Sequence, residues 1–225
     1  MRKQKNRMTT SEENYIKAIF HLGKQKDHLV NTNALALEME TKPSSVTDMV
    51  KKLAEKEIVS YQPYKGVRLT EIGLKTALML IRKHRLWEVF LVNHLDFAWD
   101  EVHEVAEQLE HIKSEKLIDA LDRILDYPAF DPHGDPIPSK EGTFTERRKK
   151  LLSDIAVGTV GVCVGVKDSS TAFLQFLDKH AIALGQTITV ISKEPFDHSL
   201  NIEIAGRSMH ISQLIANNLY LKINE

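Results

Sequence analysis

A short run of histidines and carboxylates between His103 and His111 carries the residue types best suited to chemistry in this sequence. On a helix, positions 103, 107, 110 and 111 follow the i, i+4, i+7, i+8 spacing and share one face. Such a face is normally apolar because a helix buries it, yet here it carries two imidazoles and two carboxylates. A divalent cation such as Mn, Fe, Co or Zn would offset the desolvation of these groups. A solvated acidic face is the alternative, and spacing does not decide between them.

A second pair of potential ligands, His84 and Glu88, has i, i+4 spacing in a predicted helix that begins at Glu71. Such a pair by itself is more often a surface hydrogen bond than a ligand set. Asp100 is a plausible N-cap for the 103–111 helix. If the two helices pack antiparallel, His84 and Glu88 lie against the stripe of His103, Glu107, Glu110 and His111.

The net charge of −1 conceals three regions of different charge. Residues 1–75 carry 14 Lys/Arg against 9 Asp/Glu, which gives +5. Residues 76–141 carry 7 against 14, which gives −7, and hold five of the ten histidines, whereas residues 142–225 carry 9 against 8. A basic first third indicates a polyanionic partner and an acidic, histidine-bearing middle indicates a cation, although solvated surface could also produce this division.

The elements predicted in the basic third follow the order of a winged helix-turn-helix. They are a helix opened by the capping-box spacing of Thr10-Ser-Glu-Glu13, helices over 34–39 and 44–56, and a hairpin of 58–61 with 67–70. A short helix, a tight turn and a helix that starts with small polar residues are typical of DNA-binding domains. A three-helix domain that binds protein is the alternative.

Candidate DNA contacts lie at the start of the third helix and at the hairpin tip. They are Lys42, Pro43, Ser44, Ser45, Thr47, Lys51 and Lys65. The short polar side chains suit base edges, thymine methyls or phosphates, whereas the lysines suit phosphate. We therefore expect residues 1–75 to form the DNA-binding domain.

The last third changes from helical to β-rich patterns after a Pro-, Gly- and Asp-rich linker over 128–142. Short β-rich segments are predicted at 159–166, 187–191, 200–204 and 219–223, with a helix near 171–180. They predict a small SH3-like β-barrel within 142–225, and the only cysteine, Cys163, is expected to be a buried strand residue. No signal peptide or bilayer-spanning run is recognised, which predicts a cytoplasmic protein without membrane contact.

Four motifs, in order, resemble those of the metal-dependent repressors typified by the diphtheria toxin repressor and the manganese transport regulator. They are Pro43-Ser-Ser-Val-Thr-Asp-Met-Val-Lys-Lys-Leu53, Arg82-Lys-His-Arg-Leu86, Glu107-Gln-Leu-Glu-His111 and His133-Gly-Asp-Pro-Ile-Pro138. The resemblance spans nearly all of residues 8–225. It implies a mainly α fold with small β parts: a winged helix-turn-helix, a helical metal-binding and dimerisation domain over 76–141, and an SH3-like (FeoA-like) domain.

The resemblance also implies which residues bind metal. Glu107, Glu110 and His111 match the primary regulatory site, whose ligand from the first helix falls on Asn14. Asn offers a neutral carbonyl oxygen, a weaker ligand than the family's Asp. A further family acid falls on Lys17, which cannot ligate while charged, so a two-manganese cluster is in doubt.

The same resemblance assigns a second, ancillary site to His84, Glu88 and His103, which Asp168 would complete from the SH3-like domain. Glu107 stands where iron-type repressors have Cys and manganese-type repressors have Glu. A hard carboxylate favours Mn²⁺, with Fe²⁺ next because it ranks higher in the general affinity order. Zn²⁺, Co²⁺ or Ni²⁺ could also bind in vitro.

Taken together, the sequence predicts a metal-activated homodimeric repressor of metal-uptake genes that binds an inverted-repeat operator. One alternative is a metal-independent winged-helix protein with a vestigial metal site. Another is a metalloenzyme, which is disfavoured because His103-Glu-Val-Ala-Glu107 misses the HExxH pattern at its last residue. A third is an adaptor that binds proline-rich peptide, and no cluster of exposed aromatics favours it.

Overall fold

The computed structural model describes residues 8–23 and 29–223, which divide into two compact units. The first unit comprises the described residues up to 84 together with 107–115 and 138–143. The second unit comprises residues 85–106, 116–137 and the chain from 144 onward. The division falls inside the long helix α4 (Glu71–Leu95) and separates residues 107–115 from residues 85–106.

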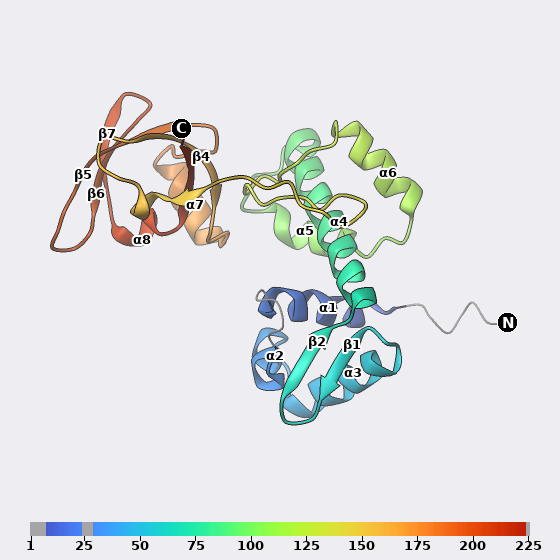
Figure 1. Ribbon diagram of the computed structural model, residues 1–225. Coiled ribbons are helices and arrows are strands. Elements are labelled where there is room, and N and C mark those ends of the chain that lie inside the picture. Colours follow the sequence, from blue (N-terminus) through green and yellow to red (C-terminus); the bar gives the residue numbers. More distant parts are fainter. Residues whose placement is uncertain (1–7, 24–28, 224–225) are drawn as a thin grey trace. The chain divides into compact units, whose positions relative to one another are not determined.

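The first unit contains a winged helix-turn-helix, drawn in blue to cyan in Figure 1. Its elements are α1 (Thr10–Leu22), α2 (Thr32–Glu38), α3 (Pro43–Glu55), β1 (Val59–Gln62) and β2 (Gly66–Leu69). The two strands pair antiparallel, from Val59 opposite Leu69 to Gln62 opposite Gly66. Apolar residues from all these elements form one core, in which Ile16, Leu35 and Leu53 are completely buried. The predicted order of three helices and a hairpin is confirmed.

The helix starts in this unit depend on local capping. The capping box of α1 is one residue earlier than predicted, because Thr9 accepts from the Glu12 N–H and the Glu12 carboxylate accepts from the Thr9 N–H. Helix α3 begins with Pro43 at its first turn, and the side chain of its N-cap residue, Lys42, makes no capping hydrogen bond. The first backbone N–H groups of α3 therefore receive no side-chain cap from Lys42.

Three helices follow the wing. Thr70 caps α4 by accepting from the Gly73 N–H, and α5 (Val102–Leu109) and α6 (Glu115–Ile124) come after it. Helix α5 ends at Leu109, so Glu110 and His111 lie in the turn beyond it and the predicted four-residue helix face is shorter than expected. Asp100 lies one residue outside the N-cap position of α5, and its Oδ2 accepts from Gln175 Nε2 instead.

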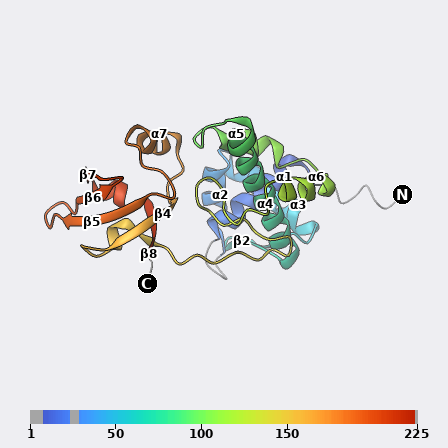
Figure 2. The same ribbon diagram turned by 90° about the horizontal axis from the view of Figure 1, so that it is seen from above.

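The C-terminal part of the second unit is a six-stranded antiparallel sheet in the order β3-β8-β4-β5-β6-β7. Its elements are β3 (Lys150–Leu151), η1 (Leu152–Asp154), β4 (Val160–Val166), α7 (Thr171–Lys179), β5 (Thr187–Lys193), β6 (Leu200–Ile204), β7 (Arg207–Ile211), α8 (Gln213–Ala216) and β8 (Leu219–Ile223). The longer strands gather together in both views (Figures 1 and 2). Their inward residues form a second core.

This architecture confirms the predicted fold class. Cys163 lies in β4 and is 1% exposed, and burial raises the pKa of its thiol to about 11. It therefore behaves as a small buried residue with little reactive thiolate. Among the described residues, no helix is both long enough and apolar enough to cross a membrane.

Candidate metal centre and DNA-binding surface

The first unit brings together a cluster of charged side chains that we call the primary cluster. It consists of Glu13 and Lys17 from α1, His84 from α4, and Glu107, Glu110 and His111 from α5 and its following turn, and we include Asn14, which lies between Glu13 and Lys17 on α1. Positions 13 and 14 come four and three residues before position 17, so the side chains of both lie next to that of Lys17 on α1. The cluster thus joins the first helix of the DNA-binding domain to the segment after α5.

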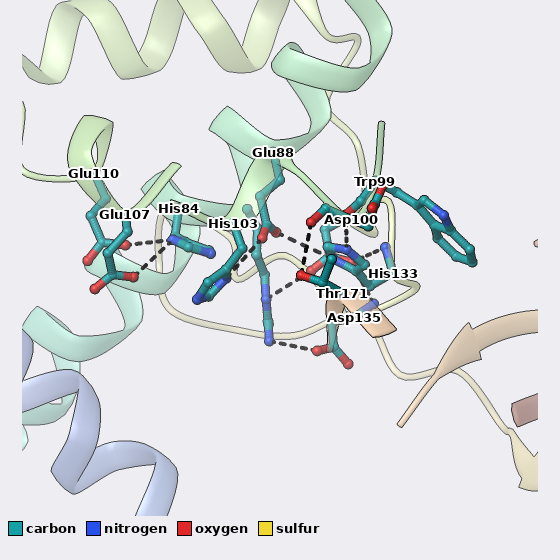
Figure 3. A network of polar contacts seen from close by, with 12 residues as sticks. His84, Glu88, Trp99, Asp100, His103, Glu107, Glu110, His133, Asp135 and Thr171 are labelled. Carbon is teal, nitrogen blue, oxygen red and sulfur yellow. Dashed lines mark hydrogen bonds and ion pairs between the residues drawn. The ribbon is translucent and has the colours of Figure 1, made fainter. Parts of the chain in front are cut away.

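Glu110 is the centre of the primary cluster and is completely buried. Its Oε2 atom lies 2.6 Å from Lys17 Nζ and 2.7 Å from His84 Nδ1. Lys17 Nζ also lies 2.7 Å from Glu107 Oε2, and His84 Nδ1 lies 3.7 Å from that same oxygen. Figure 3 shows Glu107 and Glu110 converging on His84, a residue predicted for the ancillary site. His84, Glu107 and Glu110 each offer a ligand atom within 4.8 Å of the others.

His111 is oriented by Glu13, which the sequence did not single out. The His111 Nδ1 atom donates to Glu13 Oε2 over 2.6 Å, and Lys113 Nζ lies 3.8 Å from the other Glu13 oxygen. In a neutral ring this leaves the lone pair on Nε2, which lies 4.0 Å from Glu110 Oε1. A carboxylate behind one ring nitrogen is the usual arrangement for a histidine whose other nitrogen binds metal.

Two buried oxygens in the primary cluster make no hydrogen bond to any described residue. They are Asn14 Oδ1 and Glu110 Oε1. Buried acceptors in proteins are nearly always hydrogen-bonded, so each unpartnered oxygen calls for an explanation. A cation bound by these two oxygens, with His111 Nε2 as a third donor, would satisfy both. The donor set of carboxylate, amide oxygen and imidazole therefore fits a divalent metal ion.

The second unit holds another cluster, formed by Glu88, His103, Asp131 and His133, which we call the second cluster. Glu88 lies between the two histidines (Figure 3), with Oε1 3.6 Å from His103 Nδ1 and Oε2 3.9 Å from His133 Nδ1. Glu88, Asp131 and His133 are all buried and offer ligand atoms within 4.8 Å, whereas the side chain of His103 is 69% exposed. Asp131 and His133 were not predicted as ligands, although His133 lies in a quoted motif.

The loop that carries Asp131 and His133 is tightly hydrogen-bonded. Asp131 Oδ1 accepts from the His133 and Asp135 N–H groups, each over 2.9 Å, and Oδ2 lies 3.3 Å from Arg85 Nε. His133 Nε2 lies 2.8 Å from the Trp99 carbonyl oxygen, which can only accept, so a neutral ring has its lone pair on Nδ1, toward Glu88. Burial raises the pKa of Asp131 to about 7, and the charges of Glu88 and Asp135 contribute to the rise.

Asp168, the predicted ligand from the SH3-like domain, is partly exposed, and its Oδ1 accepts from the Ser170 N–H over 2.9 Å. The β-sheet domain makes direct contacts with residues before α5 in the same unit. Trp99 Nε1 donates to Asp178 Oδ2 over 2.9 Å, and the Trp99 ring packs against the core of the sheet domain. These contacts fix the domain near the second cluster through residues that the sequence did not identify.

The predicted DNA contacts lie on an accessible surface. Lys42, Pro43, Ser44 and Ser45 are exposed at the start of α3, and Lys51 and Lys65 are also exposed. Thr47 is half-buried, and its hydroxyl donates to the Pro43 carbonyl over 3.0 Å. Beside Lys65 at the tip of the wing, Tyr64 is fully exposed. The surface therefore combines lysines, small polar side chains and a helix N-terminus, all of which can contact a nucleic acid.

A buried ion-pair network joins the helix of the primary cluster to the end of α3. Glu12, adjacent to Glu13, is completely buried, with Oε1 2.6 Å from Lys56 Nζ and 3.2 Å from Lys52 Nζ. Burial by itself would raise the pKa of Glu12, but Lys56, the Thr9 N–H and Lys52 lower it from 4.5 to about 2. α1 is thus connected to the helix that presents the predicted DNA contacts.

Comparisons with known proteins agree with this reading of the chain. Three family models match in succession: the iron dependent repressor N-terminal DNA binding domain over residues 7–67, the iron dependent repressor metal binding and dimerisation domain over 70–139, and the FeoA domain over 150–223. The resemblance inferred from the four motifs is confirmed. These models describe DNA-binding repressors, not enzymes.

Individual relatives and a solved structure match over much of their length. The HTH-type transcriptional regulator MntR of Oceanobacillus iheyensis is 33% identical over 119 residues, 53% of this chain and 80% of that protein. The iron-dependent repressor IdeR of Mycobacterium leprae is 29% identical over 194 residues, 86% of this chain and 75% of that protein. A manganese-dependent transcriptional repressor in complex with manganese has a TM-score of 0.82 and 30% identity, covering 95% of this chain and 100% of that one. The chain belongs to the family of iron- and manganese-dependent transcriptional repressors.

Proposed function

We propose that this protein is a homodimeric repressor whose DNA binding is activated by a divalent metal, with Mn²⁺ favoured and Fe²⁺ next. The observations that carry the proposal are the unpartnered buried oxygens Asn14 Oδ1 and Glu110 Oε1, and the histidine held by Glu13, whose Nε2 lies 4.0 Å from Glu110 Oε1. Asn14 belongs to the DNA-binding domain and Glu110 to the segment after α5. A metal held by both fixes α1, and with it the winged helix, in one orientation.

The ligand types favour Mn²⁺. Asn14, Glu107 and Glu110 supply oxygen atoms and His111 a nitrogen, without any thiolate, since Cys163 is buried in β4. Hard oxygen donors suit Mn²⁺ better than soft ligands do, whereas Fe²⁺ binds more tightly in the general affinity order. One relative is named as an iron-dependent repressor and one solved structure as a manganese-dependent repressor, which supports the same two ions. A metal-sensing repressor of this kind would control genes for metal uptake.

Two protomers related by a two-fold axis would present two copies of α3, so the operator should be an inverted repeat. The exposed start of α3 offers Ser44, Ser45 and Thr47 to the bases, and Lys42, Lys51 and Lys65 to phosphates. Thr47→Ala should alter base preference. Lys65→Ala should weaken binding to all sequences and lower the slope of affinity against salt.

The central experiment measures operator affinity as a function of metal. Operator fragments selected from random DNA are titrated with protein in chelator, and then with Mn²⁺, anaerobic Fe²⁺, Co²⁺ or Zn²⁺ added. Mn²⁺ should raise operator affinity far above the chelated value, and Asn14→Ala should reduce the gain. Equal affinity with and without chelator would refute metal activation and favour a metal-independent winged-helix protein.

The second cluster has a supporting role in this proposal. Glu88, Asp131 and His133 form a compact buried ligand set, to which His103 and Asp168 could add. A metal there would stiffen the loop beside the β-sheet domain, where Trp99 already contacts Asp178. Loss of this site should weaken activation and leave the primary cluster able to respond.

A further inference from the structure

Lys17 occupies the position in the primary cluster where a cation is expected. It follows Asn14 by three residues on α1, so both side chains lie on the same side of the helix. Its ammonium lies 2.6 Å from Glu110 Oε2 and 2.7 Å from Glu107 Oε2, and its side chain is only 11% exposed. Two of the predicted metal ligands therefore already hold a positive charge.

The contacts of Glu110 show how this charge is accommodated. Its Oε2 atom meets both Lys17 Nζ and His84 Nδ1, while Oε1 makes no hydrogen bond within the described chain. Oε2 thus contacts Lys17, whereas Oε1 remains available to another partner. Without Lys17, Glu107 and Glu110 would lie close together with no ammonium in contact with both, which is unfavourable for the buried Glu110.

Glu107 and Glu110 could not both hold a divalent ion while keeping the ammonium between them. Like charges at such short separation repel strongly, most of all where water is scarce. Lysine has a flexible four-carbon stem, and the side chain of its partner Glu107 is 36% exposed, so solvent reaches the Glu107 side of this ion pair. Lys17 can therefore leave the acids without any backbone change.

We propose that Lys17 is a tethered competitor of the activating metal. In the metal-free protein its ammonium neutralises Glu107 and Glu110, and it must swing out before that pair can bind a metal ion. The inference rests on the proposed function, since it concerns the same site. The consequence is that a higher metal concentration is needed for binding. The apparent dissociation constant for the metal equals the intrinsic constant divided by the fraction of molecules whose lysine is displaced. A repressor built this way responds only to an elevated metal level.

The test compares Mn²⁺ binding to the full chain carrying Lys17→Met with binding to a control, Lys75→Met. Lys75 is an exposed lysine on α4, so the control removes the same charge away from the cluster. If the lysine is in place about nine-tenths of the time, Lys17→Met should bind Mn²⁺ about tenfold more tightly by calorimetry. The metal-free variant should melt at a lower temperature than wild type, and added Mn²⁺ should stabilise it more. Lys75→Met should match wild type in both measurements.

Two further variants keep the test decisive. Lys17→Gln retains a hydrogen-bond donor without the charge, so it should also tighten Mn²⁺ binding. It replaces Lys17→Met in the test if the metal-free Lys17→Met protein does not fold. Lys17→Arg keeps the charge and should bind Mn²⁺ no more tightly than wild type. Folded Lys17→Met and Lys17→Gln with unchanged or weaker Mn²⁺ affinity would overturn the inference while leaving the proposed function intact. If wild type and Lys75→Met bind no Mn²⁺, the proposed function itself fails.

Discussion

The two clusters of acids and histidines use similar residues but differ in the hydrogen bonds and ion pairs that their acidic side chains make. In the primary cluster the acids are neutralised by Lys17, a flexible side chain from a separate helix, and two oxygens stay unpartnered. In the second cluster Asp131 accepts from two backbone N–H groups of its own loop and lies beside Arg85. The first arrangement leaves bonding capacity that only an added group can use, whereas the second is largely complete within one loop.

This difference indicates which cluster responds to metal. The primary cluster draws ligands from α1 and from the segment after α5, so a bound ion would link Asn14 to Glu110, which are far apart in the sequence. The second cluster draws Asp131 and His133 from one turn of a hydrogen-bonded loop beside Glu88 of α4, and a metal would stiffen this loop without rearranging it. We therefore expect the primary cluster to control DNA binding and the second cluster to set the rigidity of its unit.

The largest effect should come from Glu110→Gln, which keeps the shape of the buried side chain and removes its charge. The unpartnered Oε1 and the contact with Lys17 both depend on that carboxylate. Loss of a hydrogen-bond partner of a metal ligand costs up to about 100-fold in metal affinity, so loss of the ligand Glu110 should cost at least this much, and Mn²⁺-dependent operator binding should disappear. Calorimetry and operator titration measure the two effects, with circular dichroism to show that the variant is folded.

A smaller effect is expected from Glu88→Gln in the second cluster. Glu88 contacts His103 and His133, so its loss weakens that site while the primary cluster keeps all its ligands. Operator binding should still respond to Mn²⁺, at a metal concentration raised by about tenfold. The comparison between the clusters would be reversed if Glu88→Gln abolished the response and Glu110→Gln preserved it.

Glu107→Cys should change metal preference more than affinity. Glu107 is partly exposed at the edge of the primary cluster, so a thiolate can take its place with little repacking. Soft sulfur favours Fe²⁺, Co²⁺ and Zn²⁺ over Mn²⁺, and the ratio of half-activating concentrations should move by about tenfold toward those ions. Glu107→Gln is the control for simple loss of charge. A Cys variant with the same metal order as wild type would show that this position does not select the metal.

Sequence patterns predicted the fold well where periodicity and turn residues agree. The helix-turn-helix, its wing and the strands β4, β5, β6 and β8 were all found this way. Strand β7 (Arg207–Ile211) was missed because its polar residues Arg207, Ser208 and His210 hide the strand pattern, and its place is fixed by pairing with β6. Register with a neighbouring strand is a tertiary property that local sequence carries only weakly.

Only part of the site was predicted from the sequence, because several of its contacts also depend on tertiary structure. Residues at helical spacing, such as Glu107 with Glu110, can be grouped from the sequence. The contacts of Glu13 with His111 and of Lys17 with Glu110 join positions 98 and 93 residues apart, so no local spacing reveals them. Asp131 and His133 lie in a loop rather than on a periodic element, and their approach to Glu88 depends on how that loop folds back.

The last expected effect is on stability rather than on metal binding, and it concerns Glu12, which connects α1 to the end of α3. Glu12 has a folded-state pKa of about 2 against 4.5 in the unfolded chain, so the folded state binds fewer protons between these values. Its ion pairs with Lys52 and Lys56 therefore stabilise the protein fully above pH 4.5, and this contribution is lost as the pH falls toward 2.

In chelator at pH 7, Glu12→Gln should reduce the free energy of unfolding by about 2 kcal/mol. This is less than the full pKa shift would give, because Lys52 is half exposed. The difference from wild type should shrink steadily in urea melts taken between pH 5 and pH 3, while the exposed control Glu38→Gln should show neither effect. A difference that stayed constant across this range would mean that Glu12 contributes through its shape rather than its charge, and the ionic connection between α1 and α3 would have to be abandoned.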